Sequence, residues 1–160
     1  MDPGEHWVLL SYRLPRVPST PRSAVWRKLK RLGAAQLGDG LVALPADPRT
    51  REHLEWIAED VTDHGGEATL WLGRPLDPAA RSALVSQMTA AVAAEYDAVT
   101  TEATAAVCGD EVTRRRALVR LRRELRRIAG RDFFPPPQRD AARAAVEDLA
   151  AAARQAGVRT

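Results

Sequence analysis

Apolar residues run almost without interruption through residues 6–14, which predicts a β-strand with one face under helices. Two prolines end this run, since proline cannot donate to a β-ladder. Residues 34–44 predict a hairpin. Its turn is Asp39-Gly40, a strong signal because both central residues of a type I′ turn need positive φ. A fourth short strand is predicted at residues 67–72.

Between the first strand and the hairpin, the sequence predicts a helix over residues 21–32. A proline suits its first position, and Gly33 is typical of a helix end. Val25, Leu29 and Leu32 recur at helical spacing and predict the buried stripe. Trp26 lies at the edge of this stripe, and we expect its side chain to be mostly buried.

A second helix is predicted over residues 49–64, after an Asp47-Pro48 start signal and before two glycines. Leu54, Ile57 and Val61 form its buried stripe. Trp56 falls opposite that stripe. The sequence leaves open whether the C-terminal helices cover this tryptophan or whether it marks a dimer surface.

The order strand, helix, hairpin, helix, strand predicts a ferredoxin-like βαββαβ unit in residues 1–76, with both helices on one face of a four-stranded antiparallel sheet. Three further helices are predicted at residues 78–107, 111–129 and 138–155. The expected fold class is therefore α+β. We expect residues 77–160 to be a helical extension packed with the sheet unit in one structural domain.

The chain has a small positive net charge, and most of its basic residues are clustered in two segments. The 160-residue chain is 45% hydrophobic and has a formal net charge of +3. One cysteine allows no intrachain disulfide, and the N-terminus lacks the features of a signal peptide. With no apolar run of membrane-spanning length either, we expect a cytoplasmic protein with no membrane partner.

The first basic cluster lies in residues 12–44, where no acid precedes Asp39. The predicted helix puts its basic residues on the arc opposite the apolar stripe. This arrangement predicts contacts to a nucleic-acid backbone, while the alternative is a solvated helix face beside a sheet. The candidate contact residues are Arg13, Arg16, Arg22, Arg27, Lys28, Lys30 and Arg31.

A second cluster lies in the predicted helix 111–129, where leucines and Ile128 form the packed stripe. Its candidate DNA contacts are Arg116, Arg120, Arg123 and Arg127, which recur at helical spacing. The alternative is intramolecular pairing with the acids of the helix at residues 49–64.

Catalysis finds little support in the sequence. His6, His53 and His64 are scattered without metal-ligand spacing, and Cys108 resembles an idle thiol more than a nucleophile. No glycine-rich phosphate loop or nucleophile elbow is present. We therefore expect a non-enzyme that needs no cofactor and no metal.

Residues 7–45 resemble the N-terminal domain of the ChrB family, the regulators of chromate-resistance operons. The likeness rests on the strand ending Leu14-Pro15, the run Val25-Trp26-Arg27, the Leu32-Gly33-Ala34 helix end and the Asp39-Gly40 turn. The block at residues 50–56 is similar too, and the pattern extends through the arginine-rich helix. A more distant likeness is to PaaX-type repressors and to the small ferredoxin-like subunit of CRISPR adaptation.

The resemblance implies a DNA-binding transcriptional regulator of a metal-oxyanion response. Full ChrB proteins carry a second, C-terminal domain taken to sense chromate. No part of residues 1–160 resembles that domain, so whether chromate, another oxyanion or no effector is sensed stays open. The CRISPR subunits place an acid after the first strand, where this chain has Ser11, Tyr12 and Arg13.

We therefore predict a DNA-binding regulator that contacts phosphates through the basic helix. The alternative is a protein–protein interaction or dimerisation module whose basic surfaces meet acidic partners, including a homodimer. A metal-dependent nuclease is a lower alternative, because no acidic cluster follows the first strand.

Overall fold

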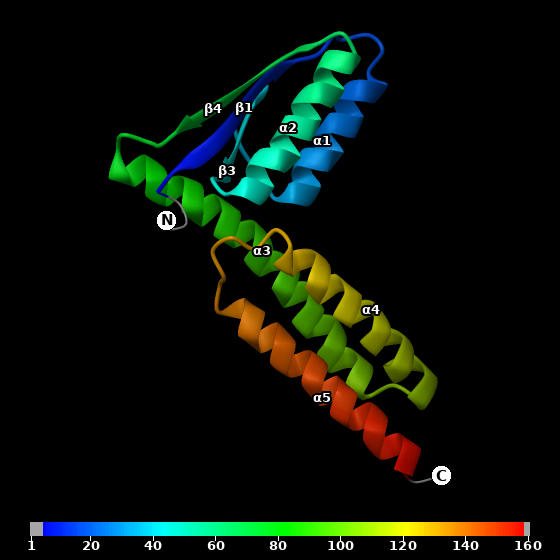
Figure 1. Ribbon diagram of the computed structural model, residues 1–160. Coiled ribbons are helices and arrows are strands. Elements are labelled where there is room, and N and C mark those ends of the chain that lie inside the picture. The colour runs from blue at the N-terminus through cyan, green and yellow to red at the C-terminus, as the bar shows by residue number, and fades with distance from the viewer. Residues whose placement is uncertain (1–4, 159–160) are drawn as a thin grey trace. The chain divides into compact units, whose positions relative to one another are not determined.

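The computed structural model describes residues 5–158 and divides into two compact units, Met1–Met88 and Thr89–Thr160. The boundary falls inside helix α3 (Pro78–Val107). Figure 1 shows the sheet and the first two helices in one unit and the α4–α5 region in the other. The organisation into one structural domain stays a prediction.

The first unit contains a four-stranded antiparallel sheet in the order β2-β3-β1-β4. This order and the alternation of elements confirm the predicted α+β class and the ferredoxin-like arrangement. The elements are β1 (Trp7–Arg13), α1 (Thr20–Leu32), β2 (Ala35–Gly38), β3 (Leu41–Pro45), α2 (Pro48–Asp63) and β4 (Glu67–Gly73).

Both α1 and α2 lie on one face of the sheet, as predicted (Figure 1). Burial alternates with the pleat of β1: Val8 and Leu10 are buried, while Leu9 and Ser11 are only partly covered. The helix α2 begins with a capping box, in which the Asp47 carboxylate accepts a hydrogen bond from the Thr50 amide at 2.8 Å. The cap therefore sets the residue at which α2 begins, and its buried apolar stripe sets the face that packs on the sheet.

The β2–β3 turn corrects one prediction. Among the described residues only glycines have positive φ, so Asp39 does not, and the turn is not type I′. Gly40 alone is left-handed, at φ +70°, and the β2–β3 register shifts between Gln36 and Gly38. An irregularity of this kind inserts an extra residue into one strand of the pair and changes its local twist.

The expected burial of Trp26 is wrong. Its side chain is 47% exposed, and the Lys30 ammonium lies 4.3 Å from the ring centroid. Val25 and Leu29 are buried, so the predicted stripe is correct. A position about 100° from Val25 simply falls outside the arc that the sheet covers.

The second unit is helical and has its own core. It contains the C-terminal part of α3, α4 (Glu111–Ala129) and α5 (Gln138–Val158). Tyr96 and Val99 of α3, Leu121 of α4 and Leu149 of α5 are buried in one cluster. The helix α5 runs past the predicted end at residue 155, because Gly157 does not terminate it.

Gly40→Ala tests the turn that joins β2 to β3. A Cβ at Gly40 would overlap the carbonyl oxygen of Tyr12, and the backbone there is left-handed. We expect Gly40→Ala to lower the free energy of unfolding by about 2 kcal/mol or more, measured by urea denaturation. Gly38→Ala is the matched control, because a Cβ at Gly38 meets nothing within 4 Å. Equal losses in both variants would contradict the packing assigned to Gly40.

Candidate nucleic-acid interface

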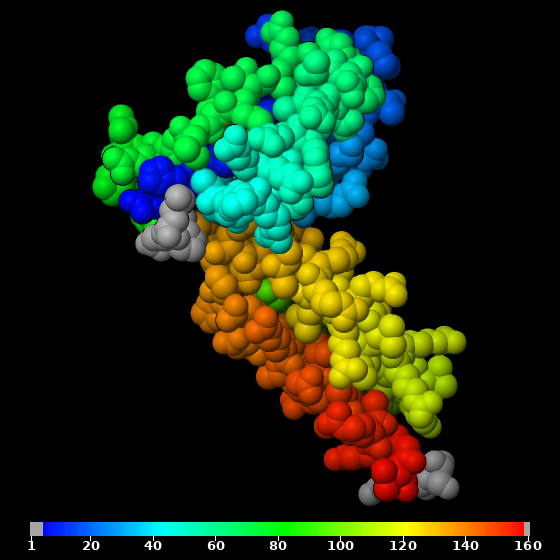
Figure 2. All heavy atoms as spheres, viewed as in Figure 1, coloured from blue at the N-terminus to red at the C-terminus, as the bar shows by residue number. Residues whose placement is uncertain are grey.

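The surface of α1 is basic because packing fixes which side of the helix meets water. Val25 and Leu29 point into the core, so Arg27 and Arg31 are carried on the solvent side, one helical turn apart. The helix contains no acid. Figure 2 shows α1 (blue) beside α2 (cyan) at the surface of this unit. All seven basic residues predicted for the first cluster are exposed, namely Arg13, Arg16, Arg22, Arg27, Lys28, Lys30 and Arg31.

Two of these cations have partners within the unit. Lys28 forms an ion pair with Asp60 of α2, and Lys30 stacks over Trp26. Within residues 5–158, no carboxylate lies at ion-pair distance from Arg22, Arg27 or Arg31. No carboxylate of the described residues therefore neutralises these guanidinium groups, and an external anion can bind to them.

The end of β1 brings Arg22 near Tyr12. Partial burial raises the pKa of the Tyr12 phenol, and the positive charge of Arg22 acts in the opposite direction. The start of α1 therefore lies close to the end of β1. This proximity places the basic loop and the basic helix in one region of the first unit.

A hollow that no sequence pattern predicted lies between α1 and α2. It has a volume of about 400 Å³ and is lined by Lys28 and Arg31 from α1 and by His53, Trp56 and Asp60 from α2. Trp56 is 57% exposed, whereas its place opposite the stripe led us to expect cover by the C-terminal helices or by a second subunit. The one sequence feature that could have indicated this hollow is the spacing of His53 and Trp56, which puts both on one face of α2. In the structure their ring centroids lie 5.8 Å apart.

The α4 surface in the second unit presents the predicted arginine stripe. Leu121 and Ile128 are buried and Leu118 and Leu125 pack partly, so this helix has the predicted orientation. The four predicted contacts, Arg116, Arg120, Arg123 and Arg127, are all exposed at the surface of the unit. Three of these four, together with Arg115 and Val119, border a shallow hollow of about 470 Å³.

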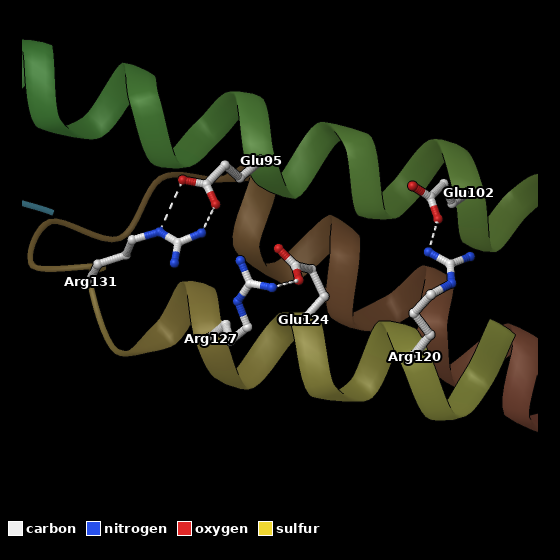
Figure 3. Close-up of polar contacts among 6 residues, drawn as sticks. All are labelled: Glu95, Glu102, Arg120, Glu124, Arg127 and Arg131. Atoms are coloured by element: carbon white, nitrogen blue, oxygen red, sulfur yellow. Dashed lines mark hydrogen bonds and ion pairs between the residues drawn. The ribbon is translucent and has the colours of Figure 1, made fainter. Parts of the chain in front are cut away.

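Part of the α4 charge is neutralised within its own unit (Figure 3). Arg120 pairs with Glu102 of α3, and Arg127 lies 3.3 Å from Glu124. In the described part of the chain, Arg116 and Arg123 have no such carboxylate. Some arginines of α4 are thus paired within the chain, but with carboxylates of α3 and α4 rather than with the predicted acids of residues 49–64.

The loop after α4 is held by polar contacts that the sequence did not indicate. Arg131 pairs with Glu95 (Figure 3), and the Tyr96 hydroxyl donates to the Asp132 carboxylate at 2.8 Å. These partners are 36 positions apart, so no local pattern could have found them. They fix the end of α4 against α3.

The basic residues of α1 and the start of α4 lie within a stretch that matches a family model. The model is described as Protein ChrB, N-terminal, and it matches residues 22–115, which is 94 of the 160 residues. The chain belongs to this family. The predicted resemblance is therefore confirmed.

A curated relative is the Protein ChrB of Cupriavidus metallidurans, which is 38% identical over 71 residues. The matched stretch is 44% of this chain and 21% of the relative. The comparison thus concerns about a fifth of that protein. No solved structure is significantly similar to this chain. None of the helices within residues 5–158 combines the length and the apolar character that crossing a bilayer requires.

Tyr96→Phe tests the contact that holds the α4–α5 loop. Burial, and then the hydrogen bond to Asp132, raise the pKa of Tyr96 to about 12. The raised pKa means that the folded state holds the phenolic proton more tightly than the unfolded chain does. Its contribution to stability is present below about pH 10 and is lost as the pH rises towards 12.

We expect the parent protein to lose stability across this window by more than Tyr96→Phe does, in parallel urea denaturations at about pH 9 and about pH 11.5. Tyr12→Phe in the first unit measures separately the part of the alkaline loss that comes from the other tyrosine, whose pKa is also raised by burial. Identical pH dependence in the parent and Tyr96→Phe would show that Tyr96 ionises as freely as in the unfolded chain.

Proposed function

We propose that this protein is a DNA-binding transcriptional regulator of the chromate-resistance type, and that α1 contacts the phosphate backbone. The observation that carries the proposal is the pair Arg27 and Arg31. Both are exposed, both lack an acidic partner among the described residues, and both stand on a helix that is fixed by its buried stripe. Rigid placement lowers the entropic cost of holding two guanidinium groups on a backbone.

Family membership supports the regulator class. The stretch that matches the family model contains all five basic residues of α1. Duplex DNA is a dense polyanion, so contacts of this kind supply affinity without reading sequence. Lys28 and Lys30 already have partners and would contribute less. The α4 stripe is a second contact surface in this proposal, chiefly through Arg116 and Arg123.

A protein–protein interaction module is the second candidate, and the surface of α4 favours it. Val119 is exposed among Arg115, Arg116, Arg120 and Arg123. A row of phosphates offers nothing apolar to this valine. An acidic partner segment with an apolar side chain would satisfy the arginines and the valine together.

The test removes the two unpaired charges of α1, as Arg27→Gln with Arg31→Gln. Both positions lie off the buried stripe, so we expect circular dichroism and melting to stay as in the parent. Affinity for operator-containing and random duplexes should fall alike. The slope of log K against log salt should shrink in magnitude by about two, because about two fewer counterions are released.

The control is Arg51→Gln with Arg154→Gln, which removes the same charge from α2 and α5. We expect a much smaller change in the slope for this control. Unchanged binding in the α1 variant at every salt concentration would rule out α1 as the contact. If Arg116→Gln with Arg123→Gln is silent as well, the interaction module is the better account.

A further inference from the structure

The two edges of the sheet differ in how well they are protected from pairing. The strand β2 has four residues and a register shift, which are features that block addition of another strand. The strand β4 has seven residues and pairs with β1 along its whole length without a bulge. Its other side has no strand neighbour in the part of the chain that the structure describes.

The side chains of β4 do not protect this edge either. After Glu67 the strand contains no charge and no proline. Its Leu72 side chain is 73% exposed and Trp71 is 56% exposed. An open apolar edge of this length is a template for a further strand.

The open face of the sheet continues the apolar surface away from the edge. Leu9 lies opposite Trp71 in the β1–β4 ladder, so both point to the face that α1 and α2 leave uncovered. These two side chains, with Leu37 and Leu41, line a hollow of about 440 Å³. A partner that pairs with β4 would reach Trp71 at the rim of this hollow.

The sequence of β4 is complementary to itself. A two-fold axis through Leu70 pairs all seven residues of the strand with those of a second copy. Ala68 then lies opposite Leu72, and Thr69 lies opposite Trp71. The single charge, Glu67, lies opposite Gly73 and next to Arg74 of the other copy, so opposite charges meet and no like charges do.

We propose that β4 is a homodimer interface, where two copies of this chain pair antiparallel about Leu70 to form one continuous sheet. The occupant is a second copy because an isologous contact requires this self-complementary pattern of size and charge. The proposal does not depend on DNA binding, and it is tested without DNA.

The first measurement is sedimentation equilibrium on the whole chain, with Leu72→Glu as the variant. We expect the parent to sediment at twice 17.5 kDa. Leu72→Glu places an unpaired carboxylate in the interface, and we expect it to weaken the dimer by about tenfold or more. Leu76→Glu is the matched control, because Leu76 is 97% exposed just beyond the strand. It should stay dimeric.

The pairing register is tested by rescue. When Ala68→Lys is added to Leu72→Glu, the introduced lysine of each copy lies opposite the introduced glutamate of the other, and we expect the dimer to return. A parent that is monomeric at all concentrations, or a Leu72→Glu protein as dimeric as the parent, would overturn the proposal. A dimer lost in Leu72→Glu but not regained in the double variant would overturn the register about Leu70.

Disulfide trapping decides the matter if Leu72→Glu fails to fold. Cys108 is exposed, so the trap uses Leu70→Cys in a Cys108→Ser background. Residues opposite each other in an antiparallel pair lie within disulfide reach, and the thiols introduced at this position in the two copies should link on mild oxidation. Leu76→Cys in the same background should link far less. Equal linking of the two variants would contradict a two-fold axis at Leu70.

Discussion

The pairing of β1 with both β3 and β4 is the constraint on which the first unit depends. It joins Trp7 to Gly73 and Arg13 to Glu67, which are far apart in the sequence, and it creates the face on which α1 and α2 bury their stripes. Two glycines close tightly around the end of this strand. A Cβ at Gly40 would overlap the Tyr12 carbonyl oxygen, and one at Gly66 would overlap that of Arg13. The chain therefore leaves the sheet at a fixed point.

This fixed exit determines where the charge of α1 is presented. The helix begins soon after β1 and has to bury Val25 and Leu29, so its rotation about its axis is set. The arginines on the opposite arc then lie in water at fixed spacing. Such a cation can bind an external anion only if no neighbouring carboxylate already pairs with it. Asp60 engages Lys28, whereas Arg27 and Arg31 have no acidic partner among the described residues.

The elements of the fold were predictable because local signals and burial agreed. The Asp47 cap, the Gly33 stop and the apolar run through β1 each indicate one outcome. Failures came where the decision is not local. The burial of Trp26 depends on the arc that the sheet covers, and the turn at Asp39 depends on a register shift between strands. The partners of Arg120 and Arg131 come from α3 and could not be chosen among the many acids of the chain. The basic residues of the candidate site were predictable as exposed, but not which of them would be unpaired.

The most direct test of α1 as the phosphate contact is a heteronuclear NMR titration of the labelled protein with a random-sequence duplex. We expect the largest changes at the backbone amides of Thr20–Leu32 and at the side-chain Nε–H groups of Arg27 and Arg31. These changes should fade as salt is raised, because the contact releases counterions. A complex that forms while the signals of α1 stay unmoved would contradict the account.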